Sequence, residues 1–250
     1  MISKNKIKLI HSLDTKKGRK SERLFIAEGP KVVCDLLNIS QADSVFATRE
    51  WLDSNRFTNA KEIIEVTDDE LLKISMLQHP QQIVALFEIR EKEYDIAAIG
   101  SRLCIALDGV QDPGNLGTII RIADWFGITD IFCSRDTADI YNPKVVQATM
   151  GSIARVSVCY TELDSLIEQL PDGTPIYGTL LDGDNIYEQP LTRNGLIIMG
   201  NEGNGISPAI RSKVNRRLLI PSYPPDRPTA ESLNVAVATA LVCSEFRRRV

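Results

Sequence analysis

The sequence predicts an α/β protein with a mostly parallel sheet covered by helices on both faces, and two observations lead to this fold class. In the second half of the chain, continuous apolar strand-like runs alternate with helix-like stretches, as in parallel sheets that are buried on both sides. The composition, with 43% hydrophobic and 25% charged residues, is that of an ordinary globular domain and excludes disordered, collagen-like and coiled-coil proteins. A chain of 250 residues has room for one large domain or two modest ones.

The first part of the chain predicts a small α/β module. A charged segment over 89–101 separates it from the rest, which gives domain boundaries of 1–95 and 100–250. Apolar periodicity, together with Pro30 and Thr67 at helix starts, predicts the elements of this module. They are a helix over 3–15, a strand over 24–29, a helix from residue 30, strands near 44–48 and 63–66, a helix from residue 67 and a strand over 82–89.

The alternation of strands and helices is clearer in the second part. Asn142 and Ser207 are each followed by proline, which is the arrangement of an N-cap and a first helical residue. The expected strands cover 103–107, 130–134, 155–160, 175–181, 195–200 and 217–221, and the expected helices cover 115–127, 143–152, 161–170, 207–215 and 231–249.

The formal net charge of −4 hides a basic segment at the N-terminus. Residues 1–23 hold eight lysines and arginines against Asp14 and Glu22, a local charge of +6 that leaves −10 for the rest. Such a segment is either a phosphate-contacting element or the solvated end of an amphipathic helix, and composition leaves both readings open.

Several classes of protein find no support in the sequence. No apolar run approaches the ~20 residues of a membrane span, and the first residues lack the apolar core of a signal peptide. Five scattered cysteines and two histidines offer little material for a disulfide framework, a zinc site or a histidine-based triad. We therefore expect a cytoplasmic protein with no metal and no membrane partner.

Three strand exits are rich in Gly, Asn and Pro, and ligands of parallel sheets lie beyond the carboxyl ends of strands. The first exit, 107–128, matches neither the dinucleotide-binding glycine spacing nor the phosphate-binding loop. On its helix Arg121 lies opposite the apolar stripe, as a site residue or as an ordinary surface arginine. The second exit, 197–210, has three glycines in six residues, which let a ligand approach the backbone. The third, 218–241, is rich in proline and precedes a helix for which Ser232 is a candidate N-cap.

Taken together and in this order, the segments LDGVQDPGNLGTIIRIADWFG, IIMGNEGNGIS and IPSYPPDRPTAESLNVAVATAL closely resemble the three motifs of the SpoU (TrmH-like) family of the SPOUT superfamily. Members of this family are RNA ribose 2′-O-methyltransferases. The upstream segment SLDTKKGRKSERLFIAEGPKVV resembles the substrate-binding N-terminal domain of many members. The resemblance implies an α/β knot, in which the C-terminal stretch threads through a loop. Periodicity alone would predict an open, unknotted sheet.

The resemblance also implies roles for individual residues, with S-adenosylmethionine as cofactor and RNA, more readily ribosomal than transfer RNA, as substrate. Two departures from the family stand out: the loop from Pro221 to Ser232 is longer than usual, and Gln82 replaces a frequent glycine. The implied catalytic set is Asn115, Arg121, Glu202, Ser232 and Asn234, and the implied cofactor-binding set is Gly200, Ile220 and Leu233.

The expected chemistry needs an aligned 2′-hydroxyl and help in removing its proton. Because a guanidinium is effectively always protonated, we expect Arg121 to hold phosphate or stabilise the developing alkoxide, with direct proton abstraction as second choice. The wide apolar surface of the last helix, with the implied family arrangement, predicts a homodimer. The alternatives are a tRNA methyltransferase, a non-catalytic RNA-binding protein of the same fold and a nucleotide-dependent oxidoreductase, the last disfavoured by the glycine spacing.

Overall fold

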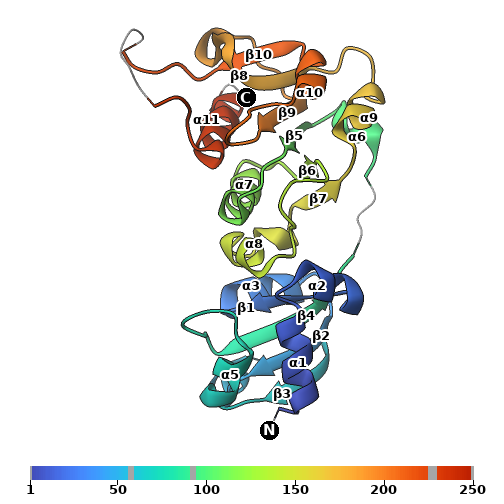
Figure 1. Cartoon of the computed structure of the whole chain (residues 1–250), viewed down its shortest axis with the longest axis vertical. Coiled ribbons are helices and arrows are strands. Elements are labelled where there is room, and N and C mark those ends of the chain that lie inside the picture. Colours follow the sequence, from blue (N-terminus) through green and yellow to red (C-terminus); the bar gives the residue numbers. More distant parts are fainter. Residues whose placement is uncertain (1, 56–58, 91–93, 225–229, 249–250) are drawn as a thin grey trace. The chain divides into compact units, whose positions relative to one another are not determined.

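The computed structural model describes residues 2–55, 59–90, 94–224 and 230–248 (Figure 1). Two compact units make up the chain. The N-terminal unit contains Met1–Glu91 together with Asp139–Arg155, and the C-terminal unit contains Lys92–Ala138 with Val156–Val250. The predicted linear boundaries at residues 95 and 100 stay a prediction, because the units follow contacts rather than chain order.

The N-terminal unit has a four-stranded mixed sheet in the order β1-β4-β2-β3. β4 pairs antiparallel with β1 and β2, whereas β2 and β3 are parallel. Each predicted element of this module is present, and two short helices, α2 and α4, were not predicted. The elements are α1 (Lys4–Ser12), α2 (Lys16–Glu22), β1 (Leu24–Glu28), α3 (Pro30–Leu37), β2 (Ala42–Ala47), α4 (Arg49–Ser54), β3 (Ala60–Glu65), α5 (Asp68–Ile74) and β4 (Ile83–Glu88).

The basic N-terminal segment is folded rather than extended. It forms α1 and α2, and Ile10 and Leu13 belong to the hydrophobic core of the unit. Arg19 is buried and holds its own unit together: it ion-pairs with Asp139 at 2.7 Å and donates to the carbonyl oxygens of Leu13 (2.8 Å) and Asp14 (2.9 Å). The cations that remain exposed are Lys4, Lys8, Lys16, Lys17, Lys20 and Arg23.

Residues 139–155 pack within the N-terminal unit although they lie between two strands of the other unit (Figure 1). They form α8 (Pro143–Ala148) and the short η1 (Ser152–Ala154). The Tyr141 ring lies 4.7 Å from that of Phe25, and Arg155 ion-pairs with Asp35 at 3.0 Å. The chain therefore passes from one unit to the other more than once.

Gln82, which stands where the family often has glycine, adopts a backbone conformation that favours glycine. Its φ of +41° lies in the left-handed region, which glycine adopts without strain and other residues adopt at a cost of about 1 kcal/mol. Its carbonyl oxygen accepts a hydrogen bond from the Thr48 backbone N–H at 2.9 Å, which fixes this conformation.

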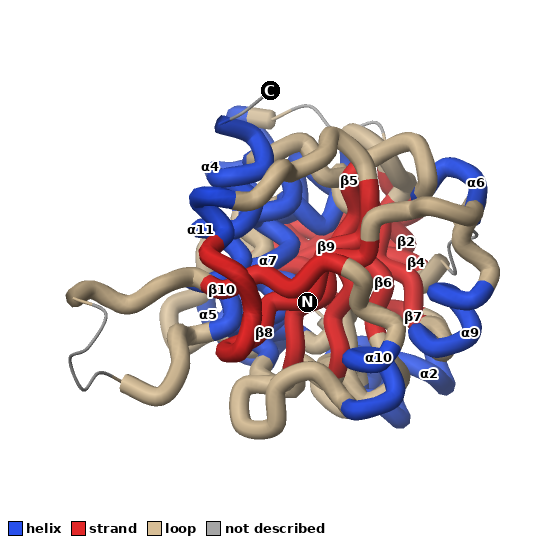
Figure 2. Tube along the Cα trace, turned by 90° about the horizontal axis from the view of Figure 1, so that it is seen from above, coloured by secondary structure: helices blue, strands red, loops and turns tan. Residues whose placement is uncertain are grey.

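The C-terminal unit has a six-stranded sheet in the order β10-β8-β9-β5-β6-β7, in which every pair is parallel. The predicted parallel sheet is confirmed. α7 and α11 cover one face, whereas α6, α9 and α10 cover the other (Figure 2). The elements are α6 (Ile96–Ile99), β5 (Leu103–Asp108), α7 (Pro113–Trp125), β6 (Asp130–Cys133), β7 (Ser157–Tyr160), α9 (Leu163–Glu168), β8 (Ile176–Asn185), η2 (Ile186–Glu188), β9 (Gly195–Gly200), α10 (Pro208–Ser212), β10 (Arg216–Leu219) and α11 (Val235–Arg248).

α7 and α11 run parallel, side by side. At their N-terminal ends the Asn234 amide donates to Asn115 Oδ1 at 3.0 Å, and at their C-terminal ends Arg247 Nε donates to the Phe126 carbonyl at 2.8 Å. Both helices therefore direct the positive ends of their dipoles toward one region.

The five cysteines are free thiols, and four of them are buried. Burial raises the pKa of Cys104 and Cys243 to about 12, so both thiols are neutral at physiological pH. Among the described residues, no helix is long and apolar enough to cross a bilayer.

Candidate active site

The three segments singled out by sequence leave the C-terminal sheet at one edge. They follow β5, β9 and β10, and because all strands are parallel their carboxyl ends share that edge. β5 and β9 are direct neighbours, with Asp108 opposite Gly200 at the end of the pair.

The first segment presents Asn115 in the first turn of α7. Asp112 is the N-cap of this helix, and its Oδ1 accepts the Asn115 backbone N–H at 2.7 Å. Pro113 occupies the first turn, where its missing N–H costs nothing. The cap and the proline fix the point at which the helix begins, and with it the direction of the Asn115 side chain.

The second segment forms a tight loop around Asn201. Its Nδ2 donates to the Gly109 carbonyl of the first segment at 2.7 Å, and its Oδ1 accepts the backbone N–H groups of Gly203 (2.9 Å) and Asn204 (3.0 Å). This one side chain fastens the second loop to the first. Sequence reasoning missed it, although asparagine is a common residue for closing such turns.

Gly200 has a structural reason to be glycine. A Cβ at this position would lie 2.3 Å from the Gly205 carbonyl carbon and 2.4 Å from the Ile206 nitrogen, because the loop folds back onto the strand end. Asp108, which is 9% exposed, accepts the Ser207 backbone N–H at 2.7 Å and holds the far end of the same loop.

The third segment ends at Asn234, which caps α11. Its Oδ1 accepts the backbone N–H groups of Ala236 (3.0 Å) and Val237 (3.2 Å). The prediction that this helix starts at residue 231 was therefore wrong, and the candidate N-cap Ser232 does not cap it. Asparagine and serine are equally good N-caps, so sequence preference alone could not choose between them.

One residue from each segment joins a chain of hydrogen bonds. Asn234 Nδ2 donates to Asn115 Oδ1 at 3.0 Å, and Asn115 Nδ2 donates to Glu202 Oε1 at 3.0 Å. Asn115 thus turns its NH₂ group toward Glu202 and its oxygen toward Asn234. Asn234 must then turn its own oxygen toward the N–H groups of α11, as observed. The carboxylate is favourably placed at the positive end of α7.

The other predicted site residues do not join this network. Arg121 lies on an exposed face of α7, which it shares with Thr118 and Trp125, and it has no hydrogen bond or ion pair to any residue that the structure describes. Ser232 is exposed and lies before the helix. Ile220 is partly buried after β10, and Leu233 is 50% exposed.

The longer proline-rich loop can be followed only in part, since residues 225–229 lie outside the described residues. Within the described part of the chain, no group of three His, Cys, Asp or Glu side chains could hold a metal ion. The site as described combines two amides, one carboxylate and two helix N-termini, a set suited to orienting a polar substrate through hydrogen bonds.

Comparison with known proteins shows which family shares these motifs. The SpoU rRNA methylase family matches residues 102–244, and the MRM3-like substrate binding domain matches residues 4–85. The 23S rRNA (guanosine(2553)-2′-O)-methyltransferase RlmP of Bacillus subtilis is 31% identical over 97% of this chain and 96% of its own.

Solved structures agree with this match. A TrmH-family protein from Porphyromonas gingivalis superimposes with a TM-score of 0.89 and 40% identity, covering 100% of both chains. The AdoMet-bound rRNA methyltransferase from Sinorhizobium meliloti gives a TM-score of 0.86 and 28% identity over 100% of this chain and 97% of its own.

The fold and the three linked motifs thus define the class of protein, an RNA methyltransferase. The chain belongs to the SpoU rRNA methylase family, and the family predicted from the sequence is confirmed.

Proposed function

We propose that the hydrogen-bonded residues Asn115, Glu202 and Asn234 form the centre at which this protein methylates RNA. The protein transfers a methyl group from S-adenosylmethionine to a ribose 2′-hydroxyl of ribosomal RNA, the reaction for which its relatives are named. The observation that carries the proposal is the network itself, since three residues distant in sequence meet within hydrogen-bond distance at the carboxyl edge of the sheet.

The residues at this edge fit S-adenosylmethionine. Gly200 lets the second loop fold back tightly onto the strand end, and the partly buried Ile220 and the half-exposed Leu233 offer apolar surface for an adenosine. When bound, this cofactor supplies an electrophilic sulfonium methyl group. The role of the chain's own residues is then to hold the ribose in line with that group and to stabilise charge on its oxygen.

Arg121 supplies the positive charge that the network lacks. Its guanidinium keeps its proton, so it stabilises a developing 2′-alkoxide or holds the adjoining phosphate rather than acting as a base. Ser232, exposed and without a hydrogen bond to the described residues, is free to donate to the substrate. Asn115 and Asn234 keep the Glu202 carboxylate in one orientation.

The test is to map ribose 2′-O-methylation in total RNA from a deletion strain against its parent. We expect one ribosomal position to lose its methyl group, to regain it fully with the wild-type gene and to regain it less completely with an Asn115→Ala variant. An unchanged methylation map in the deletion strain would contradict the proposal.

We also infer that the protein acts as a homodimer. One face of α11 is buried through Ala236 and Val242, whereas Val237 is 51% and Leu241 39% exposed on the other. Trp125 on the neighbouring α7 is 85% exposed. Apolar residues on two adjoining helices, left uncovered within the described chain, favour burial against a second copy. Light scattering of a fully active sample should give twice the 27.8 kDa monomer mass, and a monomer mass would contradict the dimer.

Three further assignments complete the proposal. Residues 1–95 serve as the RNA-binding domain and residues 100–250 as the methyltransferase domain, in line with the two family matches. The C-terminal stretch forms the family's knot, a proposal supported by the return of α11 from the edge strand β10 to α7. The protein works in the cytoplasm, which contains the ribosomal RNA and whose reducing conditions keep thiols free.

The two alternatives are less favoured. Transfer RNA appears in the names of neighbours that cover 59% of this chain and, together with rRNA, in that of a Synechocystis relative that covers 97% of it. The relatives RlmP and RlmB, which cover 97% and 89% of this chain, are named for rRNA alone. A non-catalytic RNA-binding protein would have no need for the intact network. Calorimetric titration with S-adenosylmethionine separates that alternative, because a non-catalytic protein is expected not to bind the cofactor.

A further inference from the structure

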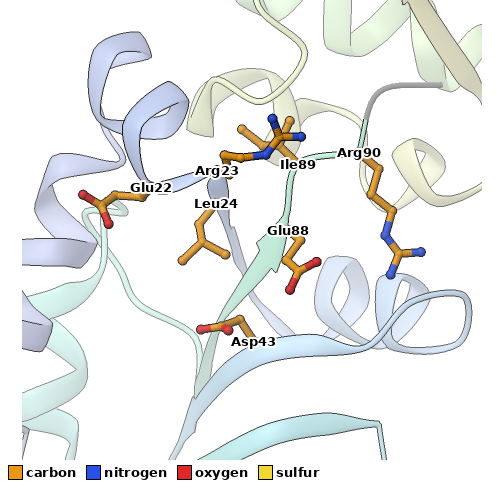
Figure 3. A pocket seen from close by; sticks show the side chains of 7 residues that line it. All are labelled: Glu22, Arg23, Leu24, Asp43, Glu88, Ile89 and Arg90. Atoms are coloured by element: carbon orange, nitrogen blue, oxygen red, sulfur yellow. The ribbon is translucent and has the colours of Figure 1, made fainter.

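A pocket of about 720 Å³ lies in the N-terminal unit, at one end of its sheet (Figure 3). None of the motif residues lines it. Its walls come from the end of α2, the start of β1, the start of β2 and the end of β4. The lining residues are Glu22, Arg23, Leu24, Asp43, Glu88, Ile89 and Arg90.

One wall of the pocket is acidic and is held in place by a lysine. Lys61 Nζ reaches across the sheet to Glu88 Oε1 at 2.5 Å and to Asp43 Oδ1 at 3.4 Å. The hydrogen bond from Lys61 lowers the pKa of Glu88, so this carboxylate stays ionised near neutrality. Its second oxygen, Oε2, accepts no hydrogen bond from the described residues. Glu88 thus presents a fixed acceptor.

The backbone is irregular where Asp43 enters this wall. In the β2–β4 pair Ala42 lies opposite Phe87 and Ser44 opposite Leu86, so Asp43 is an extra residue on its strand. A bulge of this kind bends the strand and redirects a side chain, and bulges are frequent beside functional sites. Ala42 and Ser44 are both buried, whereas the side chain of Asp43 is 34% exposed and bonded to Lys61.

Two arginines add positive charge to the pocket. Arg23 and Arg90 are exposed and line the pocket together with Ile89 (Figure 3), and neither forms an ion pair with the residues that the structure describes. Arg23 has a left-handed φ of +53° and Arg90 is anchored through its carbonyl, which accepts the Tyr141 hydroxyl at 3.1 Å. The pocket therefore offers two exposed guanidinium groups, of which that of Arg90 interacts electrostatically with Glu88, together with the Glu88 carboxylate acceptor and apolar surface.

We propose that this pocket binds one unpaired guanine nucleotide of the substrate RNA, and the proposal rests on the RNA methyltransferase function given above. Guanine has two adjacent N–H donors on its Watson–Crick edge, which match the acceptor-only Glu88 carboxylate. Adenine and cytosine put a ring-nitrogen acceptor beside their amino group, and uracil flanks its N–H with two carbonyls. Arg23 and Arg90 bind the flanking phosphates, and Leu24 and Ile89 contact the base.

The experiment uses the full-length protein and labelled single-stranded RNA hexamers, with fluorescence anisotropy as the readout. Hexauridine is compared with hexamers in which one central uridine is replaced by guanosine or by adenosine. The guanosine hexamer should bind about tenfold more tightly than the other two. Glu88→Gln should remove this preference, so that the three hexamers bind with equal affinity. Arg90→Ala should weaken binding to all three hexamers and lower the salt slope by about 0.7.

The matched control is Glu50→Gln, an exposed carboxylate on α4 of the same unit, which should keep the guanine preference. A second measurement needs no variant: unlabelled GMP should displace the guanosine hexamer from the wild-type protein better than AMP does. Equal affinities for the three hexamers, or equal displacement by GMP and AMP, would overturn the pocket assignment, as would loss of the preference in Glu50→Gln.

Titration with S-adenosylmethionine on the same samples keeps the two proposals apart. A protein that binds the cofactor and methylates RNA but shows no guanine preference leaves the proposed function intact and removes the pocket. A protein that fails to bind the cofactor removes the proposed function on which the pocket depends.

Discussion

The two units differ in how they position their polar side chains. In the C-terminal unit, uncharged Asn115 and Asn234 meet at the edge of a parallel sheet, and one hydrogen-bond pattern fixes both amides. In the N-terminal unit, a mixed sheet carries charged groups whose partners vary: Arg19 is buried against Asp139, while Lys61 bridges two exposed carboxylates.

The difference shows where sequence motifs can form. A parallel sheet gathers its strand ends at one edge, so residues that follow strands at fixed distances meet whatever lies between them. A mixed sheet has no such common edge, and its charged residues acquire a role only through the particular packing around them. The following predictions test this contrast, from the largest expected effect to the smallest.

Arg121→Lys should reduce turnover by about 100-fold while S-adenosylmethionine binding changes little. Lysine keeps the charge but loses the planar fork that holds phosphate or alkoxide. Methyl transfer to RNA gives the turnover, and calorimetry gives the cofactor affinity. Arg193→Lys, another exposed arginine of the same unit, is the control and should behave as wild type. Unchanged turnover in Arg121→Lys would remove the residue from the site.

Arg19→Met should lower the free energy of unfolding of the N-terminal unit by about 3 kcal/mol, because Asp139 would lose its buried partner. Denaturant unfolding followed by circular dichroism measures this loss. Lys17→Met, an exposed cation on the same helix, should change stability by less than ~0.5 kcal/mol. If both variants lose the same free energy of unfolding, the buried Arg19–Asp139 ion pair does not stabilise the unit.

Asn115→Ala should reduce turnover by about tenfold to 100-fold, since Glu202 and Asn234 each lose a hydrogen-bond partner. The protein should unfold at the same denaturant concentration as the wild type, because the side chain lies outside the core. Asn5→Ala, on an exposed position of α1, is the matched control. A loss of stability that matches the loss of rate would make Asn115 structural.

Replacing Lys16, Lys17 and Lys20 together by glutamine should weaken RNA binding mildly and flatten its salt dependence, because each phosphate contact contributes about 0.7–0.9 to the slope. Substitution is needed in place of deletion, since removing the segment would also remove Ile10 and Leu13 from the core. Lys73→Gln on α5 serves as control. An unchanged salt dependence of RNA binding would mean that these lysines contact solvent and not the RNA phosphates.

Much of this fold could be predicted because its patterns are local. Continuous apolar runs marked the strands of the C-terminal sheet, and prolines after Asn142 and Ser207 marked helix starts. The family motifs indicated Asn115, Glu202 and Asn234, which the structure brings together.

What escaped prediction depends on distant partners. Asn201 gains its role from the Gly109 carbonyl, 92 residues away, and nothing local distinguishes it from an ordinary turn residue. The predicted start of α11 was wrong because serine and asparagine have similar preferences for the N-cap position. In the structure it is Asn234 that caps the helix, and the same side chain donates to Asn115, which is distant in sequence. The place of residues 139–155 could not be predicted either, since Asp139 finds its partner at Arg19.

The position of residues 139–155 also determines how this protein can be taken apart. Because the chain leaves the N-terminal unit after Glu91, returns at Asp139 and leaves again after Arg155, no single cut separates two complete pieces. A fragment ending near residue 95 would expose the Phe25 ring that Tyr141 covers and would leave the Arg19 guanidinium without its carboxylate. The N-terminal unit is therefore not a detachable module. A chimaera that exchanges it between relatives must exchange two stretches of sequence together.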